Sequence, residues 1–366
     1  MPSASQHEIA KLLNLSQPTV SRSLANHPAI NADTKALVWE TAVRLGYQQK
    51  VNQLRKGKGA SKPIVIGIVI SIPQQYQSKS ETFQPVLRGI SEKSTSENLI
   101  LDVCHYEPSD MKGKTLLRRI KQVGWQGAIL FHPMSREVVE MIGRAIACVT
   151  IIENYKSDHI DCVDVDQSEG ILTMVRHLVA AGHKRIGFYS WIYQLETPWV
   201  QHRLGSFVEA LYRCGLKFRE EDCINIHLTD MLKPEEAAAV AAEKIKHGDV
   251  TAFCCAADHQ AYSLMADLAR HGLKVPQDCS ITGFDGIVPP SNHPPVTTIR
   301  VPYDELGRSS VNQLLRRLEQ PAAPRRHLLV DGEFIAGASI LPHSKSGENG
   351  ESGEKTAKRP TGAKRR

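Results

Sequence analysis

Short β-rich runs alternate with amphipathic helical patterns along most of the chain, from Ile64 onward. This alternation predicts parallel sheets with helices on both faces. Because about 280 residues are more than one such sheet usually holds, we expect an α/β body of two doubly wound lobes. The expected strands are Ile64–Ile70, Leu99–Cys104, Ala128–Phe131, Val149–Ile152, Arg185–Tyr189, Thr251–Cys255 and Cys279–Gly283. The expected helices are Phe83–Ser96, Glu169–Ala180, Arg203–Tyr212, Pro234–Lys246 and Tyr262–Arg270.

Residues 1–47 instead predict a small all-α headpiece of three helices. The first covers His7–Leu13, Ser16 caps a second that has Pro18 in its first turn, and a third follows Asn31 and stops at Gly46. The expected apolar faces are Ile9, Ala10, Leu12 and Leu13 on the first helix, Val20 and Leu24 on the second, and Ala36, Leu37, Val38, Ala42, Val43 and Leu45 on the third.

Amino-acid composition sets the bounds that we expect for the remaining segments. Residues 48–63 are a polar, basic linker, residues 64–342 form the two-lobed body, and residues 343–366 are a basic tail that we expect to be disordered. Within the body, we place the first lobe at about 64–165 plus 295–325 and the second at about 166–294 plus 326–342.

Positive charge is concentrated at the two ends of the chain. Residues 1–62 carry nine Lys+Arg against three Asp+Glu, and residues 343–366 carry seven against three. The remaining 29 Lys+Arg and 33 Asp+Glu make the body slightly acidic. This asymmetry indicates a head that binds nucleic acid, attached to a body that binds something else.

Several functional classes are disfavoured by the sequence. No apolar run is long enough to cross a membrane, and the N-terminus lacks a secretion signal, so we expect a cytoplasmic protein. The eight Cys are scattered without metal-ligand spacing, and the 15 His form no cluster with Cys or acids, so we predict neither a metal site nor a cofactor. Because no GxSxG, HExxH, P-loop or GxGxxG motif occurs at a strand-to-helix turn, we do not expect an enzyme.

The segment HEIAKLLNLSQPTVSRSLANHP, residues 7–28, has the pattern of a helix-turn-helix. Ala10 is small enough for the helix contact, Asn14 tolerates the left-handed turn, and Val20 locks the second helix against the first. Gln17, Ser21 and Arg22 point away from that apolar face, where they can meet base edges in the major groove. The alternative is an amphipathic helical hairpin without DNA contacts.

The runs PTVSRSL and INADTKALVWETAVRLGY resemble the headpiece of the LacI/GalR family of bacterial transcriptional regulators. The body resembles the same family in VRHLVAAGHKRIGF, HRLGSFVEAL, GLKVPQDCSITGFDG and PPVTTIRVPYDELGRSSVNQLL. The resemblance covers nearly everything from residue 6 to about 340. It implies a periplasmic-binding-protein-like body, a homodimer or higher oligomer, double-stranded operator DNA as partner, and a small-molecule effector. Because one headpiece reads too few base pairs, we expect the body to hold the dimer, through helices that begin near Phe83.

The resemblance also assigns the DNA contacts. Gln17 and Pro18 occupy the variable base-reading positions, whereas Thr19, Ser21 and Arg22 match the shared part of the recognition helix. Arg22 suits a bidentate contact with guanine or a phosphate contact, and Pro18 suits apolar contact with a thymine methyl group.

The linker departs from the family pattern, in which Gly-Tyr is followed by Pro-Asn and a hinge helix. Here Tyr47 is followed by Gln48, Gln49 and Lys50. Leu54 can still wedge into the minor groove, flanked by Arg55 and Lys56. The alternative is a flexible tether whose Lys50, Arg55, Lys56 and Lys58 contact phosphates. The sequence leaves both open.

Arg203 and Asp285 are the candidate effector ligands in the body. Asp285 follows an expected strand, and ligands of open α/β sheets bind beyond the carboxyl ends of the strands. The resemblance gives both residues an effector-binding role, and the alternative is a salt bridge that joins the lobes or caps a helix. Asp258 lies where the family has Asn-Asp, but Ala257 replaces the Asn, and Asp258 itself suits a helix N-cap better than a ligand. Candidate aromatic faces are Phe83, Trp199, Trp191 and Tyr193.

Together these features predict a DNA-binding transcription regulator, a repressor by default, whose operator binding responds to an effector, which we expect to be a saccharide, held between two lobes. One alternative is a regulator whose degenerate cleft serves only the dimer, which Ala257 and the altered linker favour. Another is a solute-binding protein, which would not need residues 1–62. A carbohydrate-active enzyme is the third, although no acid/base constellation can be named for it.

Overall fold

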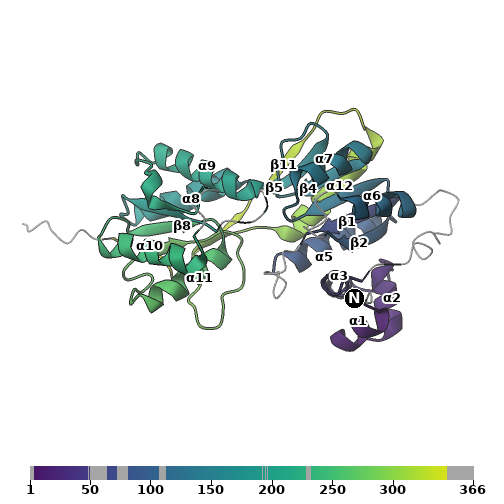
Figure 1. Cartoon of the computed structure of the whole chain (residues 1–366), viewed down its shortest axis with the longest axis horizontal. Coiled ribbons are helices and arrows are strands. Elements are labelled where there is room, and N and C mark those ends of the chain that lie inside the picture. The colour runs from purple at the N-terminus through teal and green to yellow at the C-terminus, as the bar shows by residue number, and fades with distance from the viewer. Residues whose placement is uncertain are drawn as a thin grey trace, which may run out of the picture.

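The structure is a computed structural model that describes residues 4–47, 49, 64–71, 81–106, 113–191, 193, 195, 197–227 and 232–343. The predictions for Leu54, Arg55 and Lys56, and for residues 344–366, lie outside the described residues. Figure 1 shows a small helical headpiece beside the first of two α/β lobes, with the second lobe at the far end.

The headpiece contains α1 (Gln6–Leu13), α2 (Gln17–Leu24) and α3 (Ala32–Arg44). The predicted Ser16 cap is confirmed, because Ser16 Oγ accepts a hydrogen bond from Thr19 N at 3.3 Å. Asn31, after which the third helix was expected, caps α3 through a hydrogen bond from Thr34 N to its Oδ1 at 2.7 Å. Asn14 closes the turn between α1 and α2 in the left-handed conformation, with φ of 52°, as predicted.

The apolar core of the headpiece differs from the prediction in four side chains. Leu12 is 57% exposed, and Leu37 and Leu45 are each more than a third exposed. Trp39, which the prediction left out, is fully buried. On α3 the buried residues follow helical spacing and are Lys35, Ala36, Val38, Trp39, Thr41, Ala42 and Val43. Leu37 is not among them, and Leu45 follows the last helical residue.

The first lobe is built on a six-stranded parallel sheet with the order β11-β5-β4-β3-β1-β2. Its strands are β1 (Val65–Ile70), β2 (Ile100–His105), β3 (Gly127–Phe131), β4 (Ala147–Ile151), β5 (Ile160–Val165) and β11 (His327–Val330). Its helices are α5 (Phe83–Ser96), α6 (Lys114–Arg119), which continues into a π-helical turn at Ile120–Gly124, α7 (Arg136–Ala145) and α12 (Tyr303–Glu319).

The second lobe has a four-stranded parallel sheet with the order β7-β6-β8-β9. Its strands are β6 (Ile186–Tyr189), β7 (Cys223–Ile224), β8 (Ala252–Cys255) and β9 (Ser280–Thr282). Its helices are α8 (Gln167–Ala180), α9 (Pro198–Arg213), α10 (Pro234–Lys246) and α11 (Asp258–Arg270), with a 3-10 turn at Glu220–Asp222. All seven predicted strands and all five predicted body helices are present, which confirms two parallel α/β lobes.

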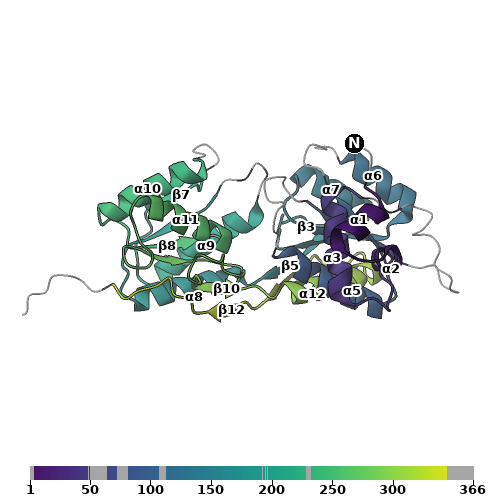
Figure 2. The ribbon, with the colours of Figure 1, turned by 90° about the horizontal axis from the view of Figure 1, so that it is seen from below.

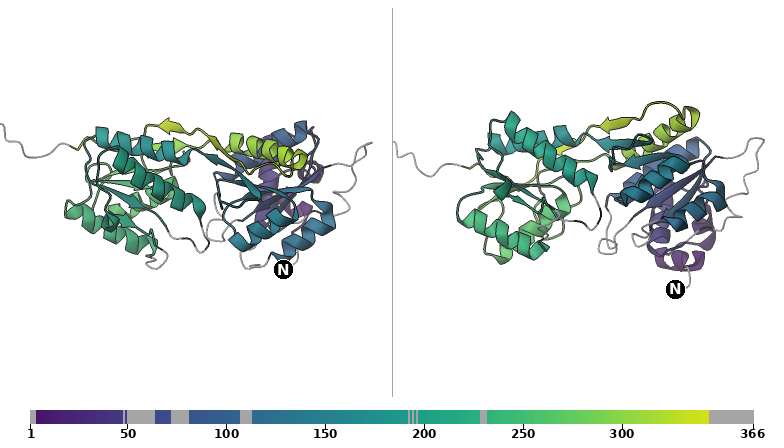
Figure 3. Two further views of the ribbon diagram at one scale, coloured as in Figure 1. Left: turned by 90° about the horizontal axis from the view of Figure 1, so that it is seen from above. Right: turned by 45° about the horizontal axis from the view of Figure 1, so that its top comes forward.

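The chain passes between the lobes three times (Figure 2): after β5, after β10 (Thr298–Arg300), and after β11 on the way to β12 (Glu333–Ile335). The strands β10 and β12 form an antiparallel ribbon. Bridges from Thr282 to Thr297 and from Asp285 to Arg300 attach this ribbon to the second lobe. Figure 3 shows the C-terminal segment, in yellow-green, running along one side of both lobes.

The predicted lobe boundaries near the C-terminus are wrong in two places. We assigned residues 326–342 to the second lobe, but His327–Val330 pairs in parallel with Cys162–Val165 in the first sheet. We assigned residues 295–300 to the first lobe, but Thr298–Arg300 is joined to the second. Strand pairing therefore places these two crossings between the lobes a few residues later in the chain than predicted. Among the described residues, no helix combines the length and the apolarity that a membrane span requires.

Candidate DNA interface and effector site

The recognition helix α2 presents its polar face to solvent. Gln17, Pro18, Ser21 and Arg22 are exposed, whereas Val20 and Leu24 on the opposite face are buried in the headpiece. Val20 is fully buried, as the helix-turn-helix pattern requires. An exposed row of hydrogen-bonding side chains on a short helix fits the major groove of DNA.

Thr19 differs from the other predicted DNA contacts, because its side chain has a structural role. Its Oγ1 lies 2.8 Å from Ser16 Oγ, and its backbone N–H donates to the same Ser16 oxygen. The side chain is only half-exposed. Thr19 therefore stabilises the first turn of α2 and offers less surface to DNA than Ser21 or Arg22.

In the second lobe, the structure brings Arg203 and Asp285 together. Arg203 lies on α9 and is 2% exposed, and its Nη2 is 3.1 Å from Asp285 Oδ1. Its Nε donates to Gln167 Oε1 at 3.0 Å, and its Nη1 donates to the backbone oxygen of Ala256 at 2.5 Å. These bonds use three of the five N–H donors of a guanidinium. A salt bridge between these two side chains, which was the alternative to effector binding, is thus present within one lobe, and their role as effector ligands stays a prediction.

The Arg203 guanidinium also lies between two aromatic rings. Its Cζ is 3.9 Å from the ring centroid of Phe284 and 4.7 Å from that of Trp199. Such cation–π contacts are stronger in a desolvated position than at the surface. Phe284 is fully buried, whereas Trp199 is half-buried and also contacts the ring of Tyr193 edge-on.

Asp285 connects this site to the crossing between the lobes. Its backbone N–H donates to Ile299 O, and its carbonyl accepts from Val301 N, just before the start of α12. Its φ of 126° is unusual for a residue with a side chain. Burial raises the pKa of Asp285, and the Arg203 ion pair opposes this shift.

Asp258 is neither an N-cap nor an exposed ligand. It is the first residue of α11, it is fully buried, and its Oδ2 accepts from the backbone N–H groups of Gly286 and Ile287 at 2.7 and 3.0 Å. A Cβ at Gly283 would lie 2.1 Å from Asp258 Oδ1, so this position requires glycine. Asp258 therefore fixes the loop that carries Asp285, which corrects the N-cap prediction. Burial and then the charge of Asp285 raise its pKa.

The predicted aromatic ligands separate into two groups. Phe83 is fully buried and stacks 6.2 Å from both Phe131 and His132, so it is a core residue of the first lobe and exposes no face to a ligand. By contrast, Trp191, Tyr193 and Trp199 are half-buried beside α9 and α11. The sequence pattern did not identify His259, whose Nε2 lies 3.1 Å from Tyr193 Oη, or Gln167, which holds Arg203.

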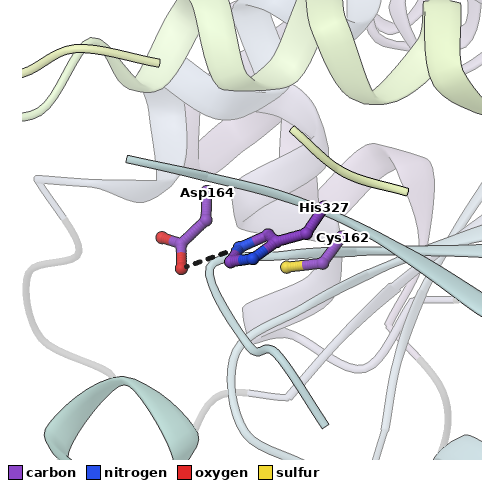
Figure 4. A group of neighbouring side chains, drawn as sticks. All are labelled: Cys162, Asp164 and His327. Atoms are coloured by element: carbon purple, nitrogen blue, oxygen red, sulfur yellow. Dashed lines mark ion pairs between the residues drawn. The ribbon is translucent and has the colours of Figure 1, made fainter. Parts of the chain in front are cut away.

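Cys162, Asp164 and His327 form a cluster that spacing along the sequence did not reveal. They lie on the paired strands β5 and β11, with one ligand-type atom from each residue within 4.8 Å of the others (Figure 4). His327 Nε2 is 3.6 Å from Asp164 Oδ2, and Asn154 Nδ2 lies 3.1 Å from His327 Nδ1. Because an amide N–H at Nδ1 leaves the imidazole proton on Nε2, facing Asp164, this arrangement fits a His–Asp contact better than a metal site.

Comparisons with known proteins agree with the fold and the motifs. Residues 175–340 match the periplasmic binding protein-like domain. The chain is 26% identical to the HTH-type transcriptional repressor CytR of Escherichia coli (strain K12) over 91% of this chain and 95% of that protein. It is 23% identical to the HTH-type transcriptional repressor PurR of Aliivibrio salmonicida over 91% and 98% of the two chains.

Solved structures show the same architecture. The transcriptional regulator CelR in complex with cellobiose has a TM-score of 0.64 at 16% identity, over 92% of this chain and 99% of that chain. The Lac repressor dimer bound to operator and the anti-inducer ONPF has a TM-score of 0.62 at 21% identity, with the same coverage. Relatives that match over nine-tenths of the chain are thus named as HTH-type transcriptional repressors, and the helix-turn-helix head and two-lobed body have the fold of the LacI-family regulators.

Proposed function

We propose that this protein is a sequence-specific DNA-binding transcription regulator, a repressor, whose affinity for operator DNA is changed by a small effector. The observation that carries the proposal is α2, which exposes Gln17, Ser21 and Arg22 on a capped helix with a buried opposite face. The relatives named as repressors match this chain through the headpiece as well as the body. We propose that Pro18 and Thr19 complete the contact surface, and that the protein acts in the cytoplasm.

The effector site is proposed at Arg203, Asp285 and the half-buried ring of Trp199. A buried ion pair offers hydrogen bonds to hydroxyl groups, and an indole face packs against the apolar face of a sugar ring. Solved structures of three regulators of the same fold contain cellobiose, sucrose or ribose. We therefore propose a saccharide as effector, with Asp258 holding the loop that carries Asp285.

The protein is proposed to act as a homodimer. A Lac repressor structure of the same fold is a dimer bound to its operator. Two headpieces related by a two-fold axis would bind an inverted repeat. Sedimentation of the full chain at micromolar concentration tests this proposal, and a monomer would contradict it.

Leu54, Arg55 and Lys56 are proposed as additional DNA contacts of the linker. If Lys56 contacts a phosphate, Lys56→Ala should reduce the slope of log affinity against log salt by about one. If Leu54 wedges between bases, Leu54→Ala should reduce the affinity for DNA and the measured bend together.

Selection of binding sites from a random DNA library tests the proposed function directly. The full chain should enrich an inverted repeat, whereas the Arg22→Ala variant should enrich it weakly or not at all. A thermal-shift screen of saccharides then tests the effector class, because a ligand at 100 times its dissociation constant adds about 2.7 kcal/mol of stability. Recovery of no common sequence by the wild-type chain would contradict the DNA-binding role.

A second candidate function is a regulator whose cleft no longer binds an effector. Two observations favour it: Ala257 is buried where the family has Asn, and Arg203 already bonds to Gln167, Ala256 and Asp285. Such a protein would bind its operator with the same affinity whichever saccharide is added.

A further inference from the structure

A continuous chain of buried polar side chains runs from the first lobe to the second. Gln167, the first residue of α8, is fully buried, and its Nε2 lies 3.0 and 2.8 Å from the two carboxylate oxygens of Asp164 near the end of β5. On the other side, its Oε1 accepts a hydrogen bond from Arg203 Nε at 3.0 Å. The amide therefore bridges a buried anion of the first lobe and a buried cation of the second.

The chemistry of the two neighbours fixes the orientation of the Gln167 amide. A guanidinium can only donate hydrogen bonds and an ionised carboxylate can only accept them, so Oε1 faces Arg203 and Nε2 faces Asp164. Asp164 and Arg203 are 0% and 2% exposed, and a polar group in such a position is costly when its partner is lost. These two side chains therefore cannot separate without leaving a buried polar group unsatisfied.

The Asp164 end of this chain is attached to two of the three crossings between the lobes (Figure 2). Asp164 lies two residues before Asp166, whose backbone N–H donates to Val330 O at 2.8 Å, where β11 ends and the third crossing begins. Its Oδ2 is also 3.6 Å from Nε2 of His327, the first residue of β11 (Figure 4). A displacement of Asp164 would therefore affect the first and third crossings together.

The Arg203 end of the chain is attached to the second crossing. Arg203 Nη2 is 3.1 Å from Asp285 Oδ1, and the backbone of Asp285 bonds to Ile299 O at 2.8 Å and to Val301 N at 3.1 Å. These two residues flank Arg300, the last residue of β10, after which the chain returns to the first lobe. The second crossing therefore begins at a backbone that Asp285 holds.

Close packing joins the three crossings as well. A Cβ at Gly332, on the third crossing, would lie 2.4 Å from Ile299 Cγ2 and 3.3 Å from Val165 Cγ2. One at Gly170, in the first turn of α8, would lie 3.3 Å from Ile299 Cγ1. Val165 directly precedes the first crossing and Ile299 the second, so the absence of a side chain at Gly332 lets all three segments lie together. Displacement of one crossing would open a gap against another.

From these contacts we infer that Gln167 is a positioning residue that couples Arg203 in the second lobe to Asp164 in the first, and through both to all three crossings. A ligand that draws Arg203 away from Gln167 would break this chain, and the crossings would then loosen together rather than one at a time. That an effector uses the coupling rests on the proposed function, whereas the coupling itself does not.

Hydrogen–deuterium exchange tests the coupling without effector or DNA, so its failure would leave the proposed function standing. Exchange of the full chain is followed by mass spectrometry, and the reporter is the backbone of residues 299–303, which is distant in sequence from position 167. Gln167→Glu keeps the size of the side chain but sets a second carboxylate against Asp164. Exchange in the reporter should accelerate at least about tenfold, whereas exchange in β1 and β8 should stay within about threefold of the wild type.

A compensating variant separates coupling from simple damage. In Asp164→Asn with Gln167→Glu, the carboxylate at position 167 can accept hydrogen bonds from the amide at position 164 and from Arg203 Nε. The chain is then rebuilt with donor and acceptor exchanged between positions 164 and 167. Exchange in residues 299–303 should return to within about threefold of the wild type.

The matched control is Asp161→Asn. Asp161 is a fully buried carboxylate on the same strand, but it pairs with Arg317 and takes no part in the chain through Gln167. Its variant should leave exchange in residues 299–303 at the wild-type rate. If Gln167→Glu does not fold, Gln167→Met removes both hydrogen bonds without adding charge, and the same acceleration is expected.

Three results would overturn the inference. The first is an acceleration in the position-167 variants that stays confined to residues 164–170 and 200–206, which would make Gln167 a purely local contact. The second is a compensating variant that exchanges as fast as Gln167→Glu. The third is an equal acceleration of residues 299–303 in Asp161→Asn, because loss of any buried carboxylate contact on β5 would then be sufficient.

Discussion

Arg203 on α9 and Asp285 after β9 form a buried ion pair of 3.1 Å, and the backbone oxygen of Asp285 accepts a hydrogen bond at 3.1 Å from Val301 N, two residues before α12 begins at Tyr303. The proposed effector site is therefore continuous with a helix of the other lobe. A ligand that changes this pairing would bias the orientation of the two lobes, because effector affinity and lobe orientation share one equilibrium.

Replacing Arg203 should destabilise the folded protein. In Arg203→Ala the buried Asp285 carboxylate loses its ion pair, and loss of one partner of a buried pair typically costs about 3–5 kcal/mol. Denaturant unfolding measures the change. Arg213→Ala, at the exposed end of the same helix, removes an i,i+4 pair with Glu209 and should cost less than about 0.5 kcal/mol. Equal losses in the two variants would show that the Arg203 pair is not a structural determinant.

The sequence predicts the strands and helices well where the buried side chains are apolar and the exposed ones polar. It predicts them less well where polar side chains are buried. The strand β5, with sequence IDCVDV, was not predicted, because Asp161 and Asp164 interrupt its apolar pattern. Both are fully buried, Asp161 in an ion pair with Arg317 at 2.7 Å and Asp164 in hydrogen bonds to Gln167. Partners that lie more than 150 positions away in the chain, such as Arg317, cannot be inferred from a local pattern.

Local sequence patterns also fail to identify some residues of the candidate effector site. The rule for strand ends and the family resemblance place Asp285 and Arg203, but neither indicates Gln167, which bonds to Arg203. Phe83 was predicted to be a ligand because it matches the aromatic residue that recurs after the first strand in the family. It is instead core, because the first turn of α5 packs against Phe131 at the end of β3.

Neutralising Asp285 should separate the effector response from DNA binding. Asp285→Asn keeps the shape of the side chain but removes its charge. A hydrogen bond to a charged group contributes about 1.5–3 kcal/mol, so effector affinity should fall about tenfold or more. Operator binding without effector should stay at the wild-type level, since the headpiece is unchanged. Operator binding titrated with a saccharide found by screening measures both quantities, and a wild-type midpoint in the variant would exclude this residue as a ligand.

Arg22 should contribute to the sequence specificity of DNA binding, and not only to the electrostatic attraction between the headpiece and DNA. Arg22→Ala should weaken binding to the selected operator by about 1–3 kcal/mol and relax preference at one base pair, because a bidentate contact is lost. Lys11→Ala removes the same charge from an exposed position on α1 and is the matched control. Its binding to specific and non-specific DNA should weaken by similar factors. If the two variants behave alike in competition assays at fixed salt, Arg22 contacts phosphate only.

Acid should destabilise the second lobe through His183. This side chain is 3% exposed, and its ring nitrogens lie 2.9 Å from Thr251 Oγ1 and 2.9 Å from Ser280 Oγ. Burial lowers its pKa from 6.5 to about 4, so the folded state binds a proton less readily than the unfolded state. The stability contributed by neutral His183 is therefore fully present above pH 6.5 and is lost as the pH falls towards 4, by up to about 3 kcal/mol.

Urea unfolding at a series of pH values measures this loss. His183→Gln, which offers a donor and an acceptor without titrating, should lose less stability over the same range, whereas His271→Gln, at an exposed position, should follow the wild type. Parallel pH curves for the wild type and His183→Gln would place the acid sensitivity in other groups.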